Sequence, residues 1–183
     1  MTSALTSFVL AIALFALAAG LALALGAAIR RRQKSWPDLI AGLQPMNSEA
    51  VAIVAQDFLQ PQRGQIALEP DEMWQLVGGA AGLKKMRKNA EVMLALAAWA
   101  ERWNFEEGVI VSERMRREAV DLRRAVRRIE LAMIPLWLLK HFRFTLPFHV
   151  QEAASAYYLM RQRLLLLYET SHAGLYPALA ASL

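Results

Sequence analysis

The most apolar part of the chain is its amino-terminal end. Phe8 to Ile29 is an unbroken run of 22 apolar or glycine residues, and no charged side chain precedes Arg30. A helix of this length spans about 33 Å, enough to cross a hydrocarbon core of about 30 Å. A cleaved signal peptide is less favoured, because it has a basic start and a shorter apolar stretch. The pattern predicts a retained signal-anchor: a transmembrane helix over residues 8–29 after a short extracytoplasmic segment, residues 1–7.

Basic residues crowd the carboxyl-terminal end of this apolar run. Because Lys and Arg beside a membrane helix tend to stay in the cytoplasm, we expect a single-pass topology with the N-terminus outside and the bulk of the chain cytoplasmic. An aromatic residue follows the basic cluster and is expected at the level of the lipid headgroups. The residues expected at the membrane interface are Arg30, Arg31, Arg32, Lys34 and Trp36.

The segment after the anchor has the composition of a linker. Residues 30–47 contain two prolines and a glycine beyond the basic cluster, and these residues favour turns and irregular backbone. The segment is therefore interpreted as a basic juxtamembrane region and linker, followed by a domain that covers residues 48–183.

Helix signals dominate this domain. Asn47 or Ser48 can cap a helix that runs to about Leu59, and a Pro near a first turn predicts a short helix after residue 69. A longer helix is expected over residues 80–103. Its apolar stretch AEVMLALAAWA has eleven residues, too few to cross a bilayer, so it predicts a core helix.

Two apolar seams with alternating spacings of three and four residues mark the remaining long helices. A connection that contains proline separates them, which favours an antiparallel pair, and Pro135 should kink or end the first helix. The first seam is Met115, Ala119, Leu122, Val126, Ile129, Met133 and Leu136, and the second is Val150, Ala153, Tyr157, Met160, Leu164, Leu167 and Ser171. The fold class expected is all-α: a coiled-coil-like helical bundle of three long and one or two shorter helices.

The first seamed helix carries two rows of arginine on its polar side. Acidic residues stand at helical spacing from them, and such exposed pairs contribute only about 0.2–0.5 kcal/mol each. The rows are therefore typical of a solvated, charge-laced face, and the alternative is a docking face for an acidic partner or anionic lipid. The pairs expected are Glu113–Arg117, Arg114–Glu118 and Arg117–Asp121. The rows are Arg116, Arg123 and Arg127, and beside them Arg117, Arg124 and Arg128.

The charge balance argues against nucleic acid as a partner. The whole chain has a net charge of +5, with 21 basic and 16 acidic residues, and four of the basic residues lie at 30–34. Residues 35–183 thus hold 17 basic and 16 acidic side chains, a net charge of +1. A nearly neutral domain has no general attraction for a polyanion, so this composition does not favour nucleic acid binding.

Motifs that carry chemistry are absent from the sequence. GGAAGLKKMRK, residues 78–88, places glycines before a helix but lacks the spacing and the GK[ST] ending of a phosphate loop, so an interhelical turn is favoured. The three histidines, His141, His149 and His172, have no carboxylate or second histidine at ligand spacing on a clear helix face. No nucleophile motif occurs. We expect no cofactor, no metal and no small-molecule substrate.

Residues 131–149 allow three interpretations, in decreasing order of preference. The aromatic residues of this segment fill the bundle core; or they contact the membrane surface or a partner; or, least favoured, they stack nucleobases. Within the predicted membrane helix, small residues at four-residue spacing would allow a second helix to approach closely. These candidate packing residues are Ala16, Gly20 and Ala24.

The sequence thus favours a non-enzymatic accessory or scaffolding protein, anchored in the lipid bilayer, whose cytoplasmic bundle binds a partner protein or a second copy. The alternative is a membrane-anchored binder of anionic lipid or another polyanion through the arginine rows. A helical enzyme is a third class, which no motif supports. Salt separates the first two, because moderate ionic strength weakens polyanion contacts much more than apolar ones.

Overall fold

The computed structural model describes Gly20 and residues 35–60, 68–103, 105–133 and 146–183. The chain divides into two compact units, residues 1–35 and 36–183. The membrane helix expected at 8–29 lies outside the described residues except for Gly20, which is helical and exposed. Among the helices that the structure describes, none combines the length and the apolar character needed to cross a membrane.

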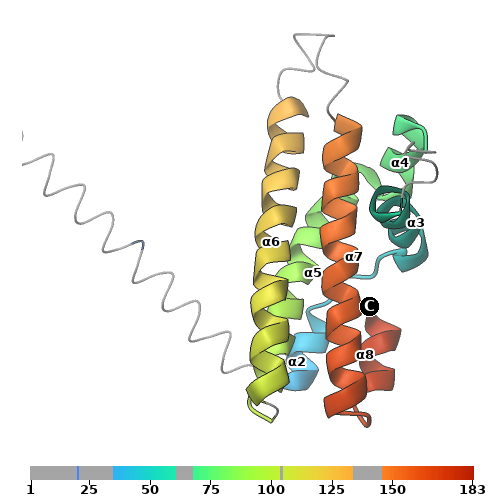
Figure 1. Ribbon diagram of the computed structural model, residues 1–183. Coiled ribbons are helices and arrows are strands. Elements are labelled where there is room, and N and C mark those ends of the chain that lie inside the picture. The colour runs from blue at the N-terminus through green and yellow to red at the C-terminus, as the bar shows by residue number, and fades with distance from the viewer. Residues whose placement is uncertain (1–19, 21–34, 61–67, 104, 134–145) are drawn as a thin grey trace, which may run out of the picture. The chain divides into compact units, whose positions relative to one another are not determined.

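The unit of residues 36–183 is an all-α helical bundle, as predicted (Figure 1). Its three long helices are α5 (Gly79–Ala100), α6 (Phe105–Met133) and α7 (Leu146–Ser171). Helices α6 and α7 run in opposite directions side by side, and this confirms the expected antiparallel pair. The described part of the unit also contains four short helices, where one or two were expected: α2 (Trp36–Ala41), α3 (Ser48–Leu59), α4 (Pro70–Leu76) and α8 (Tyr176–Ser182).

Both apolar seams form the core. In α6 every seam residue up to Ile129 is buried, whereas Met133 at the end of the helix is exposed and Leu136 lies outside the described residues. In α7 every seam residue is buried except Ser171, which is half-buried. The apolar stretch of α5 also contributes buried residues, so it is a core helix as predicted.

Helix α7 is the central element of the bundle. It packs against α3, α4, α5, α6 and α8, and its buried residues therefore lie on most of its circumference. Two of them are polar and face α3: Gln151 Nε2 donates to Asp57 Oδ2 at 3.1 Å, and Ser155 Oγ donates to the Ala55 carbonyl at 3.4 Å. Buried polar groups cost free energy unless they are hydrogen-bonded, so these contacts fix α3 on α7 in one register.

Part of the expected linker is a packed helix, which corrects the boundaries drawn from the sequence. Pro37 stands in the first turn of α2, where the missing N–H has no helical partner in any case, and Gly42 follows the helix directly. Leu39 is buried in the bundle core and Trp36 packs against it. The compact unit thus begins at Trp36 rather than at residue 48. Tertiary burial stabilises a helix that is too short to form alone.

A buried asparagine joins this amino-terminal part to the long helices. Asn89 in α5 is 1% exposed. Its side chain accepts from the Gln44 N–H and donates to the Gln44 carbonyl, both at 2.8 Å, and it also donates to the Tyr157 hydroxyl at 3.2 Å. One side chain therefore connects the α2–α3 connection, α5 and α7.

Replacing this asparagine should destabilise the bundle. Asn89→Ala leaves the backbone groups of Gln44 and the buried Tyr157 hydroxyl without their partner, and we expect a loss of about 2–3 kcal/mol in the free energy of unfolding. Denaturant unfolding in mild detergent, followed by circular dichroism, measures this loss. Lys88→Ala, at the exposed neighbouring position, is the control and should change stability by less than about 0.5 kcal/mol. Equal stability of the two variants would contradict the role of Asn89.

Candidate functional site

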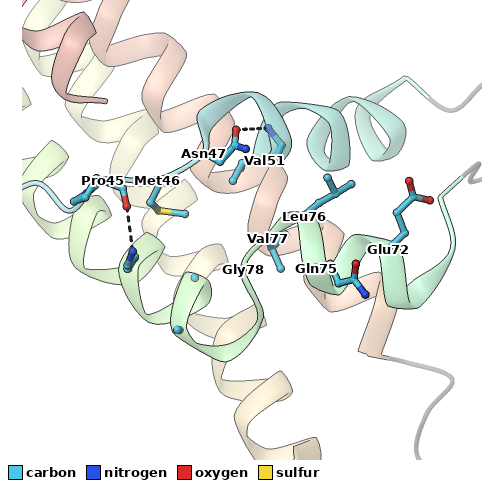
Figure 2. Close-up of a pocket in the computed structure, with 13 residues that line it drawn as sticks. Pro45, Met46, Asn47, Val51, Glu72, Gln75, Leu76, Val77 and Gly78 are labelled. Atoms are coloured by element: carbon cyan, nitrogen blue, oxygen red, sulfur yellow. Dashed lines mark hydrogen bonds between the residues drawn. The ribbon is translucent and has the colours of Figure 1, made fainter.

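An open groove lies between the start of α3, the end of α4 and the first turns of α5. Its volume is about 820 Å³, within the range of binding pockets. Figure 2 shows that side chains from all three helices surround it. The apolar lining includes Met46, Val51, Leu76 and Val77, of which Val51 and Val77 belong to the buried core.

Polar groups surround this apolar lining. Glu72 and Gln75 are exposed on α4, and Lys85 stands on α5, where its Nζ donates to the Pro45 carbonyl at 3.2 Å. The Asn47 side chain accepts from the Ala50 N–H at 3.0 Å and so caps α3, as one of the two expected caps (Figure 2). An apolar floor with a polar rim can accept an apolar side chain of a partner and bind its polar neighbours.

The glycines of residues 78–88 build the tight turn beside this groove. Gly78 and Gly79 have positive φ values of 76° and 59°, which glycine adopts without strain. A Cβ atom on Gly82 would lie 1.7 Å from the Val77 carbonyl oxygen, so only glycine lets α5 approach the end of α4 this closely. These contacts agree with the expected interhelical turn and explain why glycines occur here without any phosphate.

The arginine rows lie on α6, and most of their charge is paired. In the first row, Arg116 lies 3.7 Å from Glu101, the residue that follows α5, and 3.3 Å from Glu113 of its own helix. In the row of Arg117, that residue pairs with Glu113 at 3.6 Å, as the spacing predicted. The other pairs of this row are Arg124–Asp121 at 3.3 Å and, across to α7, Arg128–Glu152 at 3.7 Å.

Two further members of the rows differ from their neighbours, and two expected pairs are replaced. Arg123 and Arg127 are exposed on α6 and have no ion-pair partner among the described residues.

The expected pair Arg117–Asp121 gives way to Arg124–Asp121, and Glu118 pairs with Arg163 of α7 instead of Arg114. The first replacement stays within α6, where Asp121 pairs three residues onward instead of four residues back. The second joins α6 to α7, and spacing within a single helix cannot predict it.

The Glu118–Arg163 ion pair is the most enclosed of these contacts. The side chains are 12% and 30% exposed, respectively. Burial, together with the nearby Arg114 guanidinium, lowers the pKa of Arg163. The Glu118 carboxylate thus compensates a cation that has lost part of its hydration, and it links α6 to α7.

Removing the charge of Glu118 should therefore lower the free energy of unfolding more than removing an exposed charge does. We expect Glu118→Gln to lower the free energy of unfolding by about 1–3 kcal/mol, because it leaves Arg163 without its counter-ion. Glu113→Gln, which breaks only exposed pairs of the same helix, should cost less than about 1 kcal/mol. Chemical unfolding of both variants compares them. A larger loss for Glu113→Gln would contradict this account.

Aromatic side chains gather at the end of the bundle where α5 and α7 finish. The His172 ring, just beyond α7, lies 5.8 Å from Trp99, 6.1 Å from Trp103 and 5.9 Å from Tyr168, measured between ring centroids. The Tyr168 hydroxyl donates to the Leu96 carbonyl at 3.1 Å. Burial raises the pKa of the Tyr168 hydroxyl, and this effect outweighs the opposite effect of the nearby Trp36 indole. The buried Nε1 atom of Trp36 itself has no hydrogen-bond partner in the described part of the chain.

Alkaline pH should weaken the bundle through its buried tyrosines. Burial raises the pKa of Tyr157 and Tyr168 above the ordinary value of 10.0. Above that pH the unfolded chain loses these protons while the folded chain retains them, so the contribution of these two tyrosines to stability is constant well below pH 10 and falls above it. Tyr168→Phe should cost about 1 kcal/mol at neutral pH and make this alkaline fall shallower. Unfolding curves between pH 8 and about 11 measure both. An alkaline slope equal to that of the wild type would contradict the prediction.

The remaining candidate residues are only partly visible. Arg30, Arg31, Arg32, Lys34, Ala16 and Ala24 lie outside the described residues, as do residues 134–145 of the ambiguous aromatic segment. At Gly20 an added Cβ would meet no described atom within 4 Å. Trp36, expected at headgroup level, is half-buried and packs against the bundle core. In the described ranges no group of three or more His, Asp or Glu side chains could hold a metal ion.

Comparison of the chain with protein-family models, with curated proteins and with solved structures finds no match. The groove, the arginine face and the aromatic end are therefore interpreted from their own geometry.

Proposed function

We propose that this chain is a membrane-anchored, non-enzymatic accessory or scaffolding protein that binds another protein through its cytoplasmic helical bundle. In this proposal residues 8–29 cross the bilayer with the N-terminus outside, and Arg30, Arg31, Arg32 and Lys34 face the cytoplasmic lipid surface. The apolar run and the basic cluster after it support the topology.

The groove between α3, α4 and α5 is the observation that carries the protein-binding part of the proposal. It is open to solvent, so a side chain presented on the surface of another protein can enter it. Its floor offers Met46, Val51 and Leu76 to an apolar residue, while Glu72 and Lys85 at the rim offer both signs of charge. This combination is the usual anatomy of a protein interface: an apolar centre with a polar border.

The alternative function, polyanion binding through the arginine face, has less support. Four of the six arginines of the rows have carboxylate partners within 4 Å, so a polyanion would have to displace those partners. From Phe105 to Met133 the sequence of α6 holds seven basic and six acidic residues, a net charge of +1. Such a face has little long-range attraction for phosphates.

Filling the groove should abolish partner binding. Ala81 is exposed and lines the groove, so Ala81→Trp would occupy it without disturbing the core. We expect a protein that co-purifies with the wild-type chain from native membranes, in gentle detergent at low and at moderate salt, to be lost from this variant. Quantitative mass spectrometry of the purified complexes measures the loss.

Ala80→Trp is the matched control, because Ala80 is exposed on the same turn of α5 but does not line the groove. It should retain the partner at the wild-type level. Equal retention by both variants would exclude the groove as the interface. If only lipid or nucleic acid co-purifies and is lost at moderate salt, the polyanion alternative replaces the proposal.

A further inference from the structure

The aromatic end of the bundle presents an unusual apolar surface. Trp103 is 68% exposed, Phe105 is 77% exposed and Ile110 is 57% exposed, and Val109 beside them is also exposed. These four residues, named here the aromatic-end surface, lie in the α5–α6 connection and the first two turns of α6. Several large exposed apolar side chains at one end of a bundle are typical of a surface that meets a partner or a membrane.

The chain enters the bundle at this same end. Trp36, the first residue of α2, lies close to Tyr168, and both Tyr168 and Trp103 contact the His172 ring. Only seven residue steps separate Trp36 from Ile29, the last residue of the apolar run. A fully extended chain of that length covers about 25 Å at most. The end of the apolar run is therefore tethered by a short segment to the end of the bundle at which Trp36 lies.

From these observations we propose that the aromatic-end surface inserts into the headgroup region of the bilayer that anchors residues 8–29. This inference rests on the proposed membrane anchor. Trp suits this location, because its ring is apolar and its N–H remains available to water or headgroups, and Phe and Ile suit the boundary with the acyl chains.

The charges near the surface indicate which lipid property matters. Glu106 and Glu107 are exposed in the same turn of α6 as Phe105, and they outnumber the exposed Arg102 beside Trp103, so the surface has no excess of positive charge that would attract anionic headgroups. Apolar insertion therefore provides the contact, and a zwitterionic bilayer is sufficient for it. The occupant is the lipid surface, not an acidic protein or a phosphate.

A spin label tests the contact directly, because the chain contains no cysteine and a single introduced one can be labelled. Ile110→Cys places a nitroxide on the aromatic-end surface. Val120→Cys is the matched control: it is also exposed on α6, and ten residues place it about 15 Å farther along the helix. The full-length chain is reconstituted in nanodiscs of phosphatidylcholine, each disc holding one chain. Power saturation then compares access of oxygen, which is enriched in the bilayer, with access of a water-soluble nickel chelate.

The proposal predicts a several-fold higher ratio of oxygen to nickel access at residue 110 than at residue 120, unchanged by moderate salt. Equal ratios in a chain that has incorporated into discs would overturn this inference alone. A label at residue 110 that is shielded only in discs containing two chains would assign the surface to a second copy, and would also overturn it. A chain that fails to enter the discs would overturn the proposed anchor, and this inference with it.

Discussion

The burial of α7 against five other helices is the constraint on which the rest of this bundle depends. A helix with so many neighbours cannot keep a broad polar face, and the polar groups that it does bury must find partners. The Gln151 Nε2 and Ser155 Oγ atoms find them on α3, and the Tyr157 hydroxyl finds one on α5. These hydrogen bonds tolerate little rotation of α7, and they position α3 and α5, the two helices that line most of the groove.

The sequence predicted the parts of the fold whose pattern is local. The polar side of α6 is wide and its apolar seam is narrow, so its inward face could be identified before any neighbour was known. Helix α2 was missed, because Pro37 and Gly42 resemble linker residues and only the burial of Leu39 in the assembled bundle stabilises the helix. The short α8 was missed for a similar reason: its core residue Leu179 is buried only through tertiary packing.

The candidate sites show the same division. The turn at Gly78 and Gly79 and the pair Glu113–Arg117 follow from residues close together in the chain, and both could be predicted. The groove could not, because its lining comes from three separate segments that meet only through the packing of α3, α4 and α5. The pairing of Arg163 with Glu118 joins residues on different helices. Composition revealed the arginines, but only the packing of α6 revealed how much of their charge is already neutralised.

Helix α5 separates the two surfaces to which we assign contacts. The groove adjoins its first turns, around Gly82 and Lys85, and the aromatic-end surface follows its last residue, Ala100. The 15 to 18 residues between these positions and Ala100 span about 22–27 Å of helix, and the bundle core fixes this separation, since α5 is buried along its length. If the aromatic end rests on a bilayer as proposed, α5 holds the groove apart from the surface that contacts lipid, so a partner protein can occupy the groove while the other end is inserted. The length of α5 thus sets the distance between the two proposed contacts.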